Sequence, residues 1–208
     1  MSCRSASEWS AREKTLKRIS SFAEYTDLSS SMHRELYIGT ITPQVAEMVD
    51  KTIRMWNRAD DNEMVEWGKR APIKIYMNSV GGDFNSMITI MDAIKLSKTP
   101  VYTINNGTVQ KEAFYIFISG HQRYAYPRAS FLYERDLKHL DDEDRSLDNY
   151  IAFYERQLGE IKDMLLEKTK ITETEYNKHL KGTWWMTAED AHKLRICNEV
   201  LLAYQNIR

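Results

Sequence analysis

The stretch that decides the fold is IYMNSVGG, residues 75–82. A short apolar alternation ends in two consecutive glycines, which is typical of a strand that turns sharply into a helix. Glycine reaches backbone angles that a side chain forbids, and it lets another segment approach closely. Apolar residues at helical spacing follow the glycines and predict a helix over Met87–Leu96, which ends before Pro100.

A second strand and a second helix follow this first pair. Val101–Asn105 predicts a strand, Gly107 a turn, and Ala113–Ile118 a buried helix closed by Gly120. A strand, a glycine turn, a helix and another strand in this order form a parallel crossover unit. The pattern therefore predicts an α/β protein built around this unit.

The crossover unit resembles the proteolytic subunit of the Clp protease, ClpP, a family of serine peptidases that stack into barrels. Residues 78–82 (NSVGG) are similar to the family's Asn-Ser-Pro-Gly-Gly, with Val80 in the place of the proline. Further matches follow in order at Thr99–Val101, Gly107, Ala113–Phe114, Gly120, Arg123–Pro127 and Met186–Ala191, so that the resemblance covers roughly Arg34–Leu202. It implies a ClpP/crotonase-like fold of repeated β-β-α units in a spiral, with a handle helix.

The resemblance also predicts how the chain is divided. Residues 1–31 are expected to form an N-terminal leader, partly flexible, that corresponds to the axial loops of the barrel. Residues 32–208 are expected to form the ClpP-like domain, with the handle at about residues 134–168.

Composition places the chain in the ordinary globular class. It has 208 residues, of which 42% are hydrophobic and 28% charged, and 29 Lys and Arg stand against 30 Asp and Glu. This charge balance gives no reason to expect a nucleic acid or membrane partner. Cys3 and Cys197 are too few for a disulfide framework, and no apolar run reaches the roughly 18 residues of a membrane span. We expect a cytoplasmic protein, and the spacing of its residues predicts no metal site and no cofactor.

Periodicity outside the central unit predicts the remaining elements. They are a strand at Leu36–Ile41, a helix at Val45–Trp56, a charged connection at Arg58–Arg70, strands at Tyr124–Tyr126 and Ser130–Tyr133, helices at about Leu147–Lys168, from Thr172 through Leu180 and at Thr187–Leu194, and a strand at Glu199–Ala203.

The resemblance further implies a catalytic triad of Ser, His and Asp, with backbone amides that receive the oxyanion. In the family, the Ser opens the helix after the second glycine turn, and here that position holds Lys111. The position of the His holds Glu134, and counting back from the Met-Thr-Ala-Glu motif places Thr183 at the position of the Asp. All three triad positions depart from the family's pattern.

This departure predicts an ion pair where the family has a hydrogen-bonded Ser and His. A carboxylate beside a lysine favours the charged ammonium, which is neither a nucleophile nor a base. We therefore expect a salt bridge between Lys111 and Glu134 that plugs an inactive site. In the alternative arrangement, both side chains point to solvent.

Catalysis at a relocated site is the competing interpretation. Hydroxyl groups near the turn in sequence are those of Ser79, Ser86, Thr108, Ser119 and Ser130. The nearest imidazoles in sequence, His121 and His139, are expected to be solvated surface residues. The backbone amides of Gly81 and Glu112 are expected to keep an oxyanion-hole geometry, because backbone donors need no particular side chain.

The resemblance also implies residues that bind a peptide and partners that assemble with the chain. A peptide is expected to pair with the edges formed by Gly82, Asp83 and Phe84 and by Arg135, Asp136 and Leu137. Residues 137–147 fall on the handle that stacks one seven-membered ring on another. This segment has no glycine and is strongly acidic, so it favours a partner with a basic handle, or it is simply a solvated loop.

Two classes of function follow from these observations. The first is a non-catalytic ClpP-like subunit of a Clp-type ATP-dependent protease barrel. Its partners would be ClpP-type subunits in a homo- or hetero-heptameric ring, possibly stacked, an AAA+ unfoldase, and a peptide or unfolded protein. The second is an active ATP-dependent serine-type endopeptidase subunit with a relocated or unusual site. A crotonase-fold enzyme that handles thioesters is a third, less supported alternative.

Overall fold

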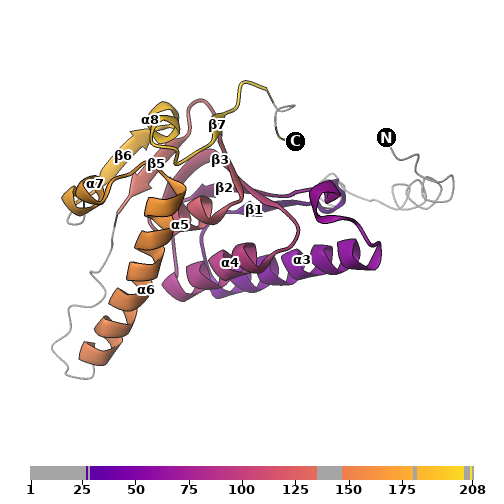
Figure 1. Cartoon of the computed structure of the whole chain (residues 1–208), viewed down its shortest axis with the longest axis horizontal. Helices are drawn as coiled ribbons and strands as arrows, with labels where there is room; N and C mark the ends of the chain where they lie inside the picture. Colours follow the sequence, from indigo (N-terminus) through magenta and orange to yellow (C-terminus); the bar gives the residue numbers. More distant parts are fainter. Residues whose placement is uncertain (1–26, 28, 135–146, 180–181, 204–206, 208) are drawn as a thin grey trace.

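The computed structural model describes residues 27, 29–134, 147–179, 182–203 and 207, with the backbone alone described at 147–152 and 154 (Figure 1). Its elements in chain order are β1 (Glu35–Ile38), α3 (Pro43–Asn62), a 3₁₀ turn η1 (Trp67–Lys69), β2 (Ile73–Ser79), α4 (Phe84–Leu96), β3 (Val101–Gln110), α5 (Glu112–Ser119), β4 (Gln122–Ala125), β5 (Ser130–Tyr133), α6 (Leu147–Lys168), α7 (Glu173–Lys178), β6 (Trp184–Thr187), α8 (Ala188–Lys193) and β7 (Glu199–Val200).

The described strands form one sheet, in which β1, β2, β3, β4 and β7 are parallel and lie in that order. Strand β3 is ten residues long, and different parts of it pair with different strands on the same side. Its first half pairs with β4, and its second half, Thr108–Gln110, pairs with β5. Strand β5 in turn pairs antiparallel with β6. The predicted α/β crossover architecture is confirmed, and β5 and β6 form a branch at the end of the sheet where β3 meets α5.

Gly107 is not the turn that the sequence predicted, because β3 continues through it. The glycine serves a close approach instead. A Cβ atom at this position would collide with the side-chain amide of Asn78, whose Oδ1 accepts the Thr108 N–H at 3.1 Å. Strand β3 therefore runs on without a break to Lys111, where the chain does turn into α5.

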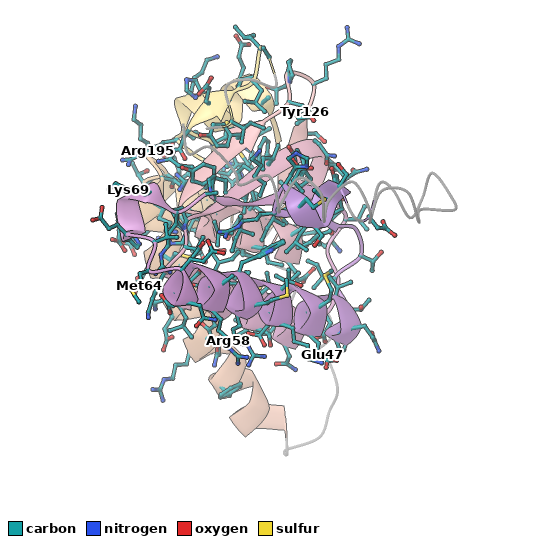
Figure 2. The ribbon with its side chains drawn as sticks, turned by 90° about the vertical axis from the view of Figure 1, so that its right-hand side faces the viewer. Glu47, Arg58, Met64, Lys69, Tyr126 and Arg195 are labelled. Atoms are coloured by element: carbon teal, nitrogen blue, oxygen red, sulfur yellow. The ribbon has the colours of Figure 1, made fainter. Side chains whose placement is uncertain are left out.

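Helices α3 and α4 lie side by side under the sheet, and α5 lies between the sheet and α6 (Figure 1). All residues of α5 after the first are buried, from Ala113 to Ser119. On α3, Glu47 and Arg58 point away from the sheet, and Met64 lies beyond the end of the helix (Figure 2). Helix α6 projects out of the body of the molecule, as the predicted handle helix does (Figure 1).

Side chains that satisfy the first backbone amides of each helix explain where several helices begin. Thr42 caps α3 and is followed by a proline at the first helical position. Asp83 caps α4, with its carboxylate 2.7 Å from the Ser86 amide nitrogen. Capping boxes at Thr172 and Thr187 confirm the predicted starts of α7 and α8.

Some elements differ from their predicted bounds. Helix α3 continues to Asn62, six residues past the predicted end at Trp56, because the charged segment that follows still places Asp60 on the buried face. Strand β6 was not predicted, since its pattern WWMT is short and adjoins the helix cap at Thr187. The last strand, β7, has two residues instead of five because it pairs with β4 only at Glu199 and Val200.

Several predictions lie outside the described residues. They concern most of the leader, which is described only at residue 27 and from residue 29 onward, together with handle residues 135–146, which include Arg135, Asp136, Leu137 and His139. Within the part of the chain that is described, no helix is long and apolar enough to cross a membrane, and no cluster of three His, Cys, Asp or Glu side chains is arranged to hold a metal ion.

A buried carboxylate ties three elements together beneath the sheet. Asp60, near the end of α3, is 2% exposed. It accepts two hydrogen bonds from the Arg34 guanidinium, at 2.6 and 2.8 Å, and one from the Thr99 hydroxyl at 2.6 Å. Burial raises the pKa of Asp60, but the bonds from Arg34 and Thr99 outweigh burial, so that the pKa lies below its ordinary value. Asp60 thus fixes the end of α3 against the starts of β1 and β3.

Replacing Asp60 should destabilise the protein strongly. We expect Asp60→Asn to lower the free energy of unfolding by about 3 kcal/mol, because it leaves the Arg34 charge without its partner. Asp50→Asn on the same helix is the matched control, since Asp50 pairs with Arg54 one turn away at the surface, and it should change the stability much less.

The pH dependence of stability is a second test of the Asp60 contacts. A lowered pKa in the folded state means that Asp60 stabilises the fold fully above the pKa of the unfolded chain and loses this effect as the pH falls through the folded pKa. Denaturant unfolding between pH 7 and pH 3 should therefore show a steeper acid loss in the wild type than in Asp60→Asn. Equal slopes would show that the Asp60 contacts carry no such linkage.

Candidate functional site

The glycine pair after β2 is packed against two other segments. Gly81 has a φ of 110°, and a Cβ atom there would collide with the carboxylate of Glu112. A Cβ atom at Gly82 would collide with the carbonyl group of Ile41. Only glycine satisfies both close approaches, so the pair is a steric requirement of the site.

The turn from β3 into α5 is strained at a single residue. Lys111 has φ 51° and ψ −118°, and its N–H donates to the Leu132 carbonyl at 3.2 Å. A positive φ costs a residue other than glycine about 1–3 kcal/mol. The surrounding strands β3 and β5 hold the turn in this conformation, so Lys111 lies directly at the N-terminal end of α5, next to the glycine pair.

The structure brings the triad-equivalent positions to one end of the sheet. Lys111 Nζ lies 3.8 Å from Glu134 Oε2, and 33% of the lysine side chain and 18% of the glutamate side chain are exposed. The predicted ion pair is therefore present. The antiparallel strands β5 and β6 end on the pair Tyr133 and Trp184. Glu134 is the residue after β5 and Thr183 is the residue before β6, so these two positions lie opposite each other just beyond that last pair. At this distance and exposure, the pair stabilises the fold by no more than about 1 kcal/mol.

The amide of Gly81 has a partner within its own turn, and the prediction for the amide of Glu112 stays a prediction. The Gly81 N–H, expected in an oxyanion hole, donates instead to the Ser79 hydroxyl at 3.2 Å. The Gly82 N–H donates to Glu112 Oε2 at 3.0 Å. The amide that the turn presents to the cleft is therefore that of Gly82, and a carboxylate of the same chain already accepts it.

The direction of the Gly82 amide follows from the pairing of its neighbours. Ile41 donates to the Gly81 carbonyl at 3.1 Å and accepts from the Asp83 N–H at 3.0 Å. In an extended segment, alternate residues direct their N–H and C=O groups to opposite edges, so Gly82 faces away from Ile41. That opposite edge is the one at which Lys111 and Glu112 lie.

Part of the predicted peptide edge is already paired within the chain. Asp83 donates its amide to Ile41 and uses its carboxylate to cap α4, and Phe84 begins that helix. Peptide binding by Gly82, Asp83 and Phe84 stays a prediction, and of these three only Gly82 directs its backbone groups to the free edge of the segment.

The hydroxyl groups considered for a relocated site have other partners in the structure. Ser86 donates to Asp83 at 2.6 Å, and Ser119 donates to the Ile116 carbonyl at 2.6 Å. Ser130 donates to the Thr108 hydroxyl at 3.0 Å, which also accepts from Gln110. Ser119 and Ser130 thus donate to a carbonyl and a hydroxyl, neither of which is a base for catalysis. The Asp83 carboxylate that accepts from Ser86 also accepts the Ser86 amide as the N-cap of α4, which is a structural arrangement.

Two of the described histidines, His33 and His121, have backbone partners. His121 is an exposed residue, as predicted, but its Nδ1 accepts the Val101 N–H at 3.0 Å, and partial burial of the ring, followed by the charge of Lys168, lowers its pKa. The Ser29 hydroxyl lies 3.5 Å from His33 Nδ1, but both residues are on one exposed helical turn, and the ring nitrogen lies closer to the Ser29 carbonyl, at 2.8 Å.

Sequence reasoning missed Glu112 as a side chain of the site and named only its amide. One signal was present: an acidic residue at the first position of a helix is favoured there by the partial positive charge of the exposed N–H groups. The sequence did not indicate that the β3–α5 turn would supply, through Glu112, the acceptor for an amide of the glycine turn.

The fold and the two interlocked turns define an α/β protein of parallel crossover units. The family model for Clp protease matches residues 26–203, which is most of the chain. This chain therefore belongs to the Clp protease family, whose members are serine peptidases.

Individual relatives support the same assignment. The chain is 26% identical over 131 residues to the ATP-dependent Clp protease proteolytic subunit 2 of Treponema denticola, a match that covers 62% of this chain and 66% of the relative. It is 25% identical over 189 residues to proteolytic subunit 3 of Rhizobium meliloti, over 88% of this chain and 90% of the relative. Among solved structures, a ClpP1 mutant from Listeria monocytogenes has the same fold, with a TM-score of 0.70 and 22% identity over 87% of this chain and 98% of that one.

The strain at Lys111 makes a prediction about stability. Lys111→Gly and Lys111→Ala both remove the ion pair, but only glycine also relieves the positive φ. We expect the glycine variant to be more stable than the alanine variant by about 1 kcal/mol, the strain energy less the extra entropy of glycine in the unfolded chain. Chemical denaturation of the two variants measures this difference.

Lys95, in the last turn of α4, is the matched control position. There the order should be reversed, because glycine in a regular helix is about 1 kcal/mol less favourable than alanine. If alanine is also the more stable residue at position 111, the turn is not strained in solution.

Proposed function

We propose that this chain is a non-catalytic, structural or regulatory subunit of a Clp-type ATP-dependent protease barrel. One observation carries the proposal: an ammonium and a carboxylate, those of Lys111 and Glu134, form an ion pair at the positions that correspond to the nucleophile and the base. Thr183, at the third position, has no carboxylate with which to orient a base.

The chemistry of the pair argues against acyl transfer at this place. A serine nucleophile loses its proton to a neighbouring base during the attack. Lysine attacks a carbonyl carbon only as the neutral amine, and a carboxylate at 3.8 Å favours the ammonium. Glu134 is held by the same contact and has no hydroxyl group to activate among the partners described for it. The pair thus fills the cleft without providing a nucleophile.

The proposed partners follow from the family, which forms oligomeric rings that work with Clp ATPases. We propose that this chain co-assembles with catalytically intact ClpP-type subunits in a heptameric ring, itself stacked on a second ring. An AAA+ unfoldase would deliver unfolded protein to that barrel in the cytoplasm. The acidic run Asp141–Asp144 in the handle sequence favours stacking against a ring with basic handles over stacking against a copy of itself.

Reaction with an active-site probe tests the absence of catalysis. The purified chain should neither hydrolyse a fluorogenic peptide nor be labelled by a fluorophosphonate, since among the described residues no serine at the turn is paired with an imidazole. A family member with an intact triad, treated in parallel, is the positive control.

Labelling that a single Ser→Ala change abolishes would contradict the proposal and establish the competing function, a peptidase with a relocated serine. Ser79, Ser86, Ser119 and Ser130 are the positions to change first, because they lie nearest to the turn in sequence.

Native mass spectrometry tests the proposed assembly. Mixed with a catalytically intact homologue, the chain should enter rings that contain both subunits, and mixing should exceed self-stacking at low salt. High salt should reduce this preference, because exposed charges are screened at distances beyond about 3 Å at 1 M ionic strength. A chain that forms no ring alone and enters none with the homologue would contradict the role of a ring subunit.

A further inference from the structure

The amide of Gly82 has a resident acceptor that belongs to the protein itself. Glu112 Oε2 lies 3.0 Å from the Gly82 nitrogen, across 30 residues of sequence. The same oxygen occupies the space in which a Cβ atom of residue 81 would lie, so it is in van der Waals contact with the turn as well as hydrogen-bonded to it. A carboxylate therefore covers the face of the glycine turn that looks into the cleft.

Several features hold the Glu112 carboxylate in this position. Glu112 is the first residue of α5, and the other seven residues of this helix are buried, so its backbone cannot move without disturbing the core. A carboxylate in the first helical turn is favoured by the helix dipole. A hydrogen bond from an amide to a carboxylate is also stronger than one between neutral groups. The contact is therefore supported from both turns.

An oxyanion site works by offering such an amide to the oxygen on which charge develops during acyl transfer. In this structure the pairing of Gly81 and Asp83 with Ile41 leaves the amide of Gly82 as the one that this segment directs toward the cleft. Any acyl oxygen that enters the cleft must compete with Glu112 for it. The competitor is intramolecular, so its effective concentration exceeds that of a dissolved ligand.

We propose that Glu112 is a built-in occupant of the oxyanion-binding amide, and that it closes the cleft to acyl groups independently of the missing triad. The inference rests on the proposed function in one respect, namely that this turn corresponds to the acyl-transfer site of the family. It extends that function, because the closed amide opposes every nucleophile, including one supplied from elsewhere in the chain. Glu112 acts as a blocking residue, and Lys111 and Glu134 act through the loss of the nucleophile.

The sequence provides a selective probe for this amide. Gly81–Gly82 is the only pair of consecutive glycines among the eight glycines of the chain. In protein labelled with glycine that carries ¹³C at the carbonyl and ¹⁵N at the nitrogen, an experiment that correlates each amide with the preceding carbonyl detects the Gly82 amide alone. Its proton frequency and its exchange rate with solvent can therefore be followed in the full-length protein without further assignment.

The first comparison is between the wild type, Glu112→Ala and Glu134→Gln. In Glu112→Ala, the Gly82 proton should shift upfield and exchange roughly tenfold faster, because the charge-assisted hydrogen bond is lost. Glu134→Gln is the matched control: it neutralises the other carboxylate of the cleft and should leave the Gly82 signal in place. Glu112→Gln keeps an acceptor oxygen without the charge and should give an intermediate shift, and it serves as the second variant if the alanine variant does not fold.

The second comparison asks whether the vacated amide accepts an external anion. Sodium acetate should move the Gly82 signal of Glu112→Ala back toward the wild-type position, whereas it should leave the wild type unchanged, and sodium chloride at equal ionic strength should affect neither. A Gly82 signal that is the same in the wild type and both Glu112 variants overturns the proposal. A signal that shifts in Glu112→Ala but does not respond to acetate overturns the part that assigns an anion site to the turn.

The outcome is separable from that of the proposed function. Labelling of the wild-type chain by a fluorophosphonate contradicts the non-catalytic role, whereas the hydrogen bond between Gly82 and Glu112 is read directly from the Gly82 signal. Conversely, an unresponsive Gly82 signal contradicts the blocking role of Glu112, but it does not affect the argument from the residues at the three triad positions.

Discussion

The architecture of this chain depends on a steric constraint at two consecutive residues. The backbone after β2 passes so close to Ile41 on one side and to the β3–α5 turn on the other that no side chain fits at Gly81 or Gly82. This close approach fixes where α4 starts and where the loop before α3 lies. It also brings the N-terminal end of α5 against the end of β2. The candidate site is built from these same contacts, so the packing of the glycine pair also places Lys111 and Glu112 beside it.

The fold of the family is present, and charged side chains lie at the turn that joins β3 to α5. The chain belongs to a family of serine peptidases, and its fold is that of a ClpP subunit. Yet the strained turn that ends β3 carries an ammonium, and the residue after β5 carries a carboxylate that pairs with it. A second carboxylate, from Glu112, accepts the backbone amide beside them. Lys111, Glu134 and Glu112 thus each have a partner within the described part of the chain, which is the condition under which charges are tolerated at a half-buried place.

The buried contacts of Asp60 and the residues of the candidate site lie at opposite ends of the strands. The buried Asp60 and its bonds to Arg34 and Thr99 join α3 to the sheet at the end of β2 and β3 opposite to the glycine pair. The strained residue, Lys111, lies at the other end, where its conformation is set by β3 and β5. A scaffold stabilised at one end of its strands can hold a strained turn at the other, and this division allows side chains of the cleft to change while the fold persists.

The sequence by itself determined the crossover unit and the caps at Thr172 and Thr187, because glycine punctuation, helical periodicity and capping motifs are local signals. The ion pair of Lys111 with Glu134 was one of two arrangements that the sequence left open, and the tertiary structure decided between them. Only the tertiary structure decided that β3 runs through Gly107, that α3 extends past Trp56, and that β6 pairs with β5. It also decided that the amide of Gly82, and not that of Gly81, faces the cleft and is bonded to Glu112. The direction of an N–H group depends on the torsions of its own peptide and on the strand that pairs with its neighbours. Its acceptor comes from a residue 30 positions away, so no local pattern specifies the contact.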